Sequence, residues 1–362
     1  MSDLSYVSAS ELEAVATEML VAHELSAYDA ATVARCLVEA DLRGVETHGV
    51  VRLPHYLNRV RLGLINPRPK LEVDSKTPVA KLLDADDGFG FVAAELAVRV
   101  AIDSAKDLGI GMVAVKRSSH FGMAASYVLQ AVRAGYMCMV FTNASKGMPP
   151  WGGKEALLGT SPLAAGAPGG EGPDFVLDMS VAVAARGKVR LAKLRGDSVP
   201  EGFGLDRDGK ATTDPSAILD GGVVLPVGGA KGSALAMMMD IFSGVFTGSA
   251  FAGDVTNHAE NFEKPQDVGH FILVIKPDLF MTTDEFKARM DTLSGRVKAV
   301  APAKGFSEIL VAGEYEARIA AARQETGIPL PTAELAALEA AAKDLGIAFP
   351  AVHKAPLDAQ RV

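Results

Sequence analysis

The stretch from Asp41 to Tyr56 concentrates side chains that can carry acid–base and anion-binding chemistry. It combines histidines, arginines, acids and a tyrosine in a mixture that no ordinary helix face or strand requires. A neutral histidine can exchange a proton near pH 7, and an arginine can bind a carboxylate through two parallel hydrogen bonds. His48 and Arg52 therefore predict a site for a small organic acid.

Pro54 indicates how this pair is positioned, since proline is tolerated in the first turn of a helix. A helix is predicted over residues 52–62, followed by a glycine. Thr47 and His48 then approach its amino end, where backbone N–H groups and the helix dipole favour an anion. A Thr-His pair here is also typical of a simple helix cap, and Arg52 of a surface ion pair, so this stretch alone leaves both interpretations open.

A second histidine, His120, lies in a loop between regular elements. The sequence predicts a strand over residues 111–116, a helix over 124–134 and a strand over 137–142. This order predicts a parallel strand–helix–strand unit, and ligands of α/β proteins bind where loops leave the carboxyl ends of strands. His120 is therefore a second candidate for proton transfer, with a cap of the following helix as the alternative.

Residues 143–170 are rich in glycine, proline and small polar residues, yet too apolar for a disordered linker. Ordered binding loops are predicted, in which Ser145 and Lys146 offer polar anchors. A surface role is the alternative for Lys146. Trp151, the only tryptophan, is predicted to pack in the core, with a pocket wall as the alternative.

Two later stretches suit a nucleotide. Asp178, near the end of an apolar strand, is a candidate for a ribose hydroxyl, and a cap of the next helix is equally compatible. A strand that begins at Val223 leads through a glycine turn into an apolar helix. This turn presents backbone amides and Lys231 to an anion such as a pyrophosphate.

Composition excludes several classes of function. The 362 residues are 49% hydrophobic, which suits two globular domains or one large domain with an extension. A formal net charge of -8 argues against binding to nucleic acid or to an anionic membrane.

Cys36 and Cys138 are too few for a disulfide scaffold and are predicted to be buried thiols. The amino terminus has no signal-peptide pattern and no apolar run reaches membrane length, so a cytoplasmic protein is expected.

Standard motifs are missing from the chain. No Gly-x-Gly-x-x-Gly follows a strand, and no P-loop, Gly-x-Ser-x-Gly or His-Glu-x-x-His occurs. The histidines and acids lack metal-ligand spacing, so no metal site is predicted. An organic-acid site with two histidines, together with phosphate-binding glycine turns, would serve hydride transfer to a nicotinamide.

Seven motifs occur in an order that resembles the type 2 malate/L-lactate dehydrogenases, over residues 10–327. They are Thr47-His-Gly-Val-Val-Arg52, Ser119-His-Phe-Gly122, Thr142-Asn-Ala-Ser145, Pro149-Pro-Trp-Gly-Gly-Lys-Glu155, Gly159-Thr-Ser-Pro162, Asp178-Met-Ser180 and Lys231-Gly-Ser233. The resemblance implies a mixed α/β fold that is not a Rossmann fold, with a mostly antiparallel sheet and a helical segment from both chain ends. It also implies a homodimer that binds NAD, with NADP as the alternative.

The resemblance divides the chain into residues 1–70, 71–310 and 311–362. The first segment would carry substrate residues, the second would bind the cofactor, and the third would pack beside the first. The family includes dehydrogenases of malate, lactate, sulfolactate and ureidoglycolate, and reductases of cyclic imines such as piperideine-2-carboxylate. A small carboxylate is therefore the expected substrate.

The resemblance also assigns residues. His120, in preference to His48, is expected to remove the hydroxyl proton in the oxidative direction, while the other histidine orients the oxygen. Arg52 is expected to bind the substrate carboxylate, with Thr47 and Lys146 beside it. The expected cofactor contacts are Ser145, Asp178, Met179, Ser180, Lys231, Gly313 and Glu314. A cyclic-imine reductase, a ureidoglycolate dehydrogenase and, remotely, a non-catalytic cofactor-binding protein are the alternative functions.

Overall fold

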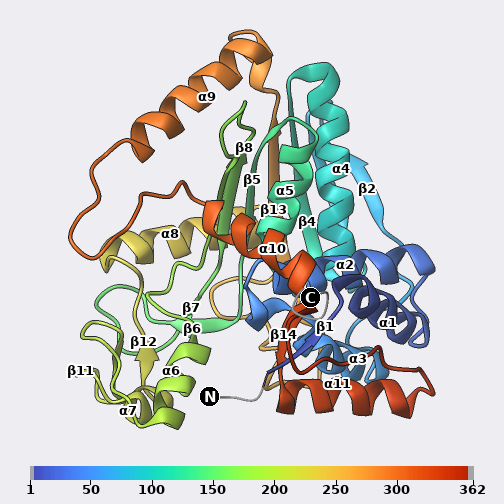
Figure 1. The fold of residues 1–362 in the computed structure, drawn as a ribbon, viewed down its shortest axis with the longest axis vertical. Coiled ribbons are helices and arrows are strands. Elements are labelled where there is room, and N and C mark those ends of the chain that lie inside the picture. The colour runs from blue at the N-terminus through green and yellow to red at the C-terminus, as the bar shows by residue number, and fades with distance from the viewer. Residues whose placement is uncertain (1–3, 358–362) are drawn as a thin grey trace.

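The computed structural model describes residues 4–357, and its centre is a seven-stranded sheet (Figure 1). Its strands, in spatial order, are β2 (Glu72–Ser75), β3 (Ala80–Asp84), β4 (Ile110–Ser118), β13 (Val268–Ile275), β5 (Met137–Thr142), β8 (Leu163–Ala167) and β9 (Phe175–Met179). Every neighbouring pair is antiparallel except β3 and β4. The predicted mostly antiparallel sheet is confirmed.

Helices cover this sheet and its ends. They are α1 (Ala9–Val21), α2 (Ala27–Leu42), α3 (Leu53–Arg61), α4 (Gly90–Leu108), α5 (Ala125–Arg133), α6 (Arg186–Arg195), α7 (Pro215–Leu219), α8 (Ala230–Asp240), α9 (Thr283–Lys298), α10 (Glu314–Thr326) and α11 (Thr332–Asp344), with the short turns η1 (Glu46–His48), η2 (Val50–Arg52), η3 (Ile241–Val245) and η4 (Pro277–Leu279). α4 and α5 cover one face of the sheet, where Val113, Val140 and Ile272 are fully buried. Within the described part of the chain, none of these helices has both the length and the apolar composition that a bilayer span requires.

The predicted unit around His120 has the expected order of elements, with α5 between β4 and β5. Its two strands are not neighbours, however, because β13 lies between them. Ile272 of β13 pairs with Val113 on one side and with Val140 on the other, antiparallel to both. β4 and β5 thus run in the same direction, as expected of a parallel unit, but they do not pair with each other, since a strand from far along the chain has entered the ladder between them.

The two ends of the chain meet beside the sheet. β1 (Leu4–Val7) pairs antiparallel with β14 (Ile328–Pro331), and α11 lies against α3 and η2. In Figure 1 the helices α1, α2, α3 and α11 gather on this side of the molecule. This arrangement agrees with a helical segment built from both chain ends, while the segment boundaries at residues 70 and 310 stay predictions.

Two parts of the chain form a smaller lobe at the other side (Figure 1). Its strands are β6 (Lys146–Met148), β7 (Leu158–Gly159), β10 (Gly204–Leu205), β11 (Ala211–Thr212) and β12 (Val223–Val224). Together with α6 and α7 they enclose a separate apolar cluster around Val181 and Ile218. α8 packs against this cluster through Ala236 and against the sheet through Met239, so it connects the lobe to the sheet.

The packing of β13 against η3 can be tested by a substitution at their contact. A Cβ atom on Gly269 would lie 1.5 Å from the carbonyl oxygen of Ser243, which is backbone and cannot move aside. We expect Gly269→Ala to lower the free energy of unfolding by about 3 kcal/mol or more, measured by chemical denaturation. Gly295→Ala is the matched control, because nothing lies within 4 Å of its added Cβ in α9 and alanine favours a helix. Equal stability of the two variants would contradict the described packing.

Candidate active site

One face of α3 supplies a large part of the site. Arg52, His55, Tyr56 and Arg59 recur at the spacing that places side chains on one side of a helix. The helix spans Leu53–Arg61, as the position of Pro54 predicts. The turns η1 and η2 precede it and carry Thr47 and His48.

A buried carboxyl group fixes these two turns. The Oδ2 atom of Asp41 accepts the Val50 N–H at 2.8 Å, and a Cβ atom on Gly49 would lie 1.8 Å from Oδ1. Only glycine fits at position 49, so His48 and Val50 are held on either side of it. Burial raises the pKa of Asp41 to about 8, which keeps this carboxyl group protonated at neutral pH.

Three imidazole rings stack at the centre of the site. The His120 ring packs nearly parallel to that of His48, at a centroid distance of 5.6 Å, and to that of His258, at 5.1 Å, with interplanar angles of 23° and 19°. A fourth ring, that of His55, places Nε2 at 3.0 Å from the Nδ1 atom of His258. The structure thus brings the two predicted histidines together and adds two that the sequence analysis missed.

The hydrogen bonds of His120 come from three parts of the chain. Its Nδ1 atom lies 2.7 Å from the Tyr56 hydroxyl and 3.2 Å from the backbone nitrogen of Gly122. Its own backbone N–H donates to the Oε1 atom of Gln266 at 3.0 Å. These bonds hold the ring in place. The side chain does not cap the following helix α5, which was the alternative role.

Arg59 ties the loop that carries His258 to α3. Its side chain is fully buried, and its guanidinium donates to the carbonyl oxygens of His258 at 3.0 Å, Asn261 at 2.8 Å and Lys264 at 3.3 Å. The guanidinium also lies 5.9 Å from the centre of the Phe262 ring. A buried cation needs such partners, so the loop and the arginine stabilise each other.

The charge balance of the site favours an anion. Arg52 donates through Nε to the Thr47 carbonyl, and no acid lies within ion-pair distance of it in the described part of the chain. Burial, and then the charge of Arg52, lower the pKa of His48 to about 4, that of His258 to about 3 and that of His120 well below its usual value. At neutral pH the site therefore holds the guanidinium groups of Arg52 and Arg59 among neutral imidazoles. This excess of positive charge suits a carboxylate.

Three of the expected cofactor residues, Asp178, Met179 and Ser180, lie at the end of β9 and directly after it. The carboxylate of Asp178 accepts the Ala125 N–H at 2.7 Å, at the start of α5 and just after the His120 loop, and its burial raises its pKa to about 6. Asp178 therefore caps a helix that precedes it, and not the next helix. The Ser180 hydroxyl donates to the Thr160 carbonyl at 2.8 Å. Met179 ends β9 and pairs with Leu163.

Lys231 and Trp151 flank the glycine turn before α8. Gly228 and Gly229 have φ of 61° and 63°, and Lys231 is the exposed second residue of the helix. Trp151 is 61% exposed, so the prediction that it packs in the core is wrong. Its ring instead lies against Gly229, where a Cβ atom would come within 2.9 Å of it.

The remaining predicted residues are placed less centrally. Gly313 has φ of 88° and approaches Val176 so closely that a Cβ atom would clash at 2.6 Å. The carboxylate of Glu314 bonds to Lys298 and, at 2.7 Å, to Arg318, and the Lys298 bond leads in lowering its pKa to about 2. A cofactor contact at Glu314 would thus come from its backbone. Lys146 is exposed on β6 and Ser145 beside it is half-buried, and no described hydrogen bond joins either side chain to the histidines.

One signal could have found two of the missed residues, and no local signal could have found the third. The helical spacing from Arg52 places His55 and Tyr56 on the same face, so a reading of α3 by face would have included them. His258 lies in a loop without a motif, far along the chain. Its position depends on the Arg59 contacts, which no local pattern reveals.

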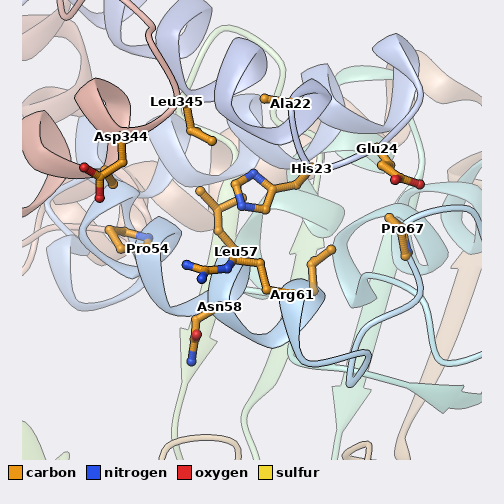
Figure 2. A pocket seen from close by; sticks show the side chains of 12 residues that line it. Ala22, His23, Glu24, Pro54, Leu57, Asn58, Arg61, Pro67, Asp344 and Leu345 are labelled. Carbon is orange, nitrogen blue, oxygen red and sulfur yellow. The ribbon is translucent and has the colours of Figure 1, made fainter.

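A separate cavity of about 860 Å³ lies against the other side of α3 (Figure 2). It is lined by Pro54, Leu57, Asn58 and Arg61 of that helix, with His23 and Asp344 among the facing residues. No residue of the histidine stack lines it, so α3 separates this cavity from the site.

The buried histidines predict a dependence of stability on pH. A histidine whose folded pKa lies below its unfolded value, about 6.5, contributes stability above pH 6.5 that is lost as the pH falls toward the folded value. For His48 this window runs from 6.5 to about 4. We expect the free energy of unfolding to fall less steeply in His48→Gln, by about 1 kcal/mol per pH unit in this window, in denaturation series at several pH values. An unchanged slope would mean that His48 is not buried in neutral form.

Comparison with known proteins identifies the family of the chain. Residues 7–339 match the family model described as malate/L-lactate dehydrogenase. The chain is 39% identical to an L-sulfolactate dehydrogenase of Methanocaldococcus jannaschii over 80% of this chain and 83% of the relative, and 36% identical to a malate dehydrogenase of Pyrococcus horikoshii over 88% and 89%. The solved structure of the M. jannaschii sulfolactate dehydrogenase superimposes with a TM-score of 0.90 at 34% identity, covering 95% of this chain and 98% of that one. The chain therefore belongs to the malate/L-lactate dehydrogenase family and is an oxidoreductase that acts on a CH–OH group.

Proposed function

We propose that this protein transfers a hydride between NAD and a short 2-hydroxy acid of the malate or lactate type. The observation that carries the proposal is the guanidinium of Arg52, which has no acidic partner in the described chain and lies among neutral imidazoles. A 2-hydroxy acid offers both groups that this site lacks. Its carboxylate would pair with Arg52, and its hydroxyl would meet the histidines.

The described residues fit a nicotinamide dinucleotide. The left-handed turn at Gly228 and Gly229 exposes the first N–H groups of α8 next to Lys231, a combination that favours a diphosphate. The carboxylate of Asp178 suits a ribose hydroxyl, which supports NAD. Lys188 and Arg190, exposed on α6, are the alternative anchors for the 2′-phosphate of NADP.

The protein's own side chains orient the substrate, transfer the proton and limit the access of water. Arg52 orients the substrate by its carboxylate, and His48 and His120 provide one proton-transfer group and one hydrogen-bond partner for the reacting oxygen. The stacked rings and the Arg59-bound loop cover this oxygen and reduce the access of water. When bound, the nicotinamide supplies or accepts the hydride.

Activity measurements at 340 nm test this proposal. NADH and NADPH, offered separately with a panel of 2-oxo acids and cyclic imine carboxylates, should show oxidation of NADH by oxaloacetate or pyruvate. Arg52→Met should lower kcat/KM by about 100-fold, since it removes a charge-assisted contact to the carboxylate, and Arg52→Lys should recover part of it. Oxidation only by imines would favour the reductase alternative, and tight NADH binding with no turnover of any compound would contradict a dehydrogenase.

We also propose that the protein is a homodimer, as the family resemblance implies. An apolar stripe along α8 and η3 supports it, because Met237, Ile241, Val245 and Phe246 are each more than half exposed. A second copy of the chain would cover this stripe.

Light scattering after size-exclusion chromatography tests the dimer. Ile241→Glu with Val245→Glu should raise the dissociation constant about 100-fold or more, because a charge would be buried in the interface. Leu62→Glu is the control, since Leu62 is equally exposed but lies at the end of α3. A monomeric wild-type protein at micromolar concentration would contradict the proposal.

A further inference from the structure

The Nδ1 atom of His120 faces two hydrogen-bond donors. The Gly122 nitrogen lies at 3.2 Å, and a backbone N–H can only donate. An Nδ1 atom that accepts this bond must keep its lone pair. A neutral imidazole has one proton, so the proton of His120 is on Nε2. The Tyr56 hydroxyl, at 2.7 Å, then also donates to Nδ1.

The Tyr56 side chain is tightly packed, which keeps its hydroxyl group beside His120. Its side chain is almost fully buried, and its ring meets those of Phe91 and Phe89 edge to face at 5.5 and 6.2 Å. Burial raises the pKa of its hydroxyl to about 12, so Tyr56 remains a neutral donor throughout the physiological range. The His120 ring packs nearly parallel to those of His48 and His258, and Gln266 binds its backbone.

This arrangement limits what His120 can do. With its proton on Nε2, the neutral ring presents a donor to the substrate, and no described group bonds to that Nε2 atom. Such a donor binds a carbonyl oxygen and stabilises the charge that develops on it, but it cannot accept the proton of a hydroxyl group.

His48 has the complementary pattern. Its Nδ1 atom lies 2.9 Å from the Thr47 hydroxyl, and a hydroxyl oxygen can accept as well as donate. A proton on Nδ1 of His48 therefore finds an acceptor, which leaves the lone pair of its Nε2 atom free. His48 can then take a proton that His120 cannot take.

We propose that Tyr56 is a positioning residue that, with the Gly122 N–H, fixes His120 as a neutral hydrogen-bond donor and so leaves proton transfer to His48. This proposal rests on the proposed dehydrogenase function and reverses the sequence-based preference for His120 as the base. In the oxidative direction the hydroxyl proton passes to Nε2 of His48, which becomes an imidazolium. The hydrogen on the substrate carbon leaves with its electron pair for the oxidised nicotinamide, and the C=O bond forms while Nε2–H of His120 binds its oxygen.

Substitutions that mimic one ring nitrogen test this division of roles. The amide nitrogen of glutamine can replace the Nε2–H donor, so His120→Gln should keep at least tenfold more kcat than His120→Ala. His48→Gln should lose 10²- to 10⁴-fold, because an amide cannot take up the proton. If His120→Gln were as inactive as His120→Ala while His48→Gln kept near-normal kcat, the division of roles would be overturned.

The position of the proton can be measured without any substrate or cofactor. In enzyme with ¹⁵N-labelled histidine, NMR should show the His120 proton on Nε2, with the His120 signals identified by their absence in His120→Gln. A proton on Nδ1 would overturn the proposal. This result does not depend on turnover, so it distinguishes a wrong tautomer from a wrong dehydrogenase assignment.

Tyr56→Phe tests the positioning residue itself and keeps the ring that packs against Phe89 and Phe91. Loss of the hydroxyl donor favours protonation of Nδ1, so the acid limb of the kcat/KM profile should move to higher pH, and kcat should fall about tenfold. The thermal unfolding temperature of the variant reports whether it is folded. A folded Tyr56→Phe variant with an unchanged kcat and pH profile would refute a role for Tyr56.

Discussion

The site depends on the buried guanidinium of Arg59. Three backbone carbonyls of the loop at residues 258–264 accept hydrogen bonds from this group, and the contacts of His55 with His258 and Phe262 add to the packing of the loop against α3. Once the loop is there, His258 stacks on His120 and Gln266 binds the backbone of His120. One charge–carbonyl cluster therefore joins two regions that are far apart in the sequence and completes the surroundings of the His120 ring.

The second constraint is the absence of a carboxylate partner for Arg52 and the histidines within the described chain. Burial without a counter-charge keeps the imidazoles neutral, since a protonated ring would have no compensation beside Arg52. The nearby Asp41 does not provide it, because its buried carboxyl group has a pKa of about 8 and serves to fix the turn at Gly49. Under the proposed function the substrate carboxylate would supply the negative charge, which would couple its binding to the electrostatics of proton transfer.

Much of this could be predicted from the sequence where the determinants are local. Pro54 predicted the start of α3, and His48, Arg52 and His120 do meet in one place. The failures are all non-local. The place of β13 between β4 and β5, the cap that Asp178 makes on α5, the exposure of Trp151 and the arrival of His258 depend on segments that only the folded chain brings together.

The most direct test is a crystal structure of the enzyme with NADH and oxamate, an unreactive analogue of a 2-oxo acid. The account predicts the oxamate carboxylate on the guanidinium of Arg52 and its carbonyl oxygen about 3 Å from Nε2 of His120, with His48 at the same oxygen. Oxamate bound elsewhere, such as in the cavity behind α3, with Arg52 free of it, would contradict the account.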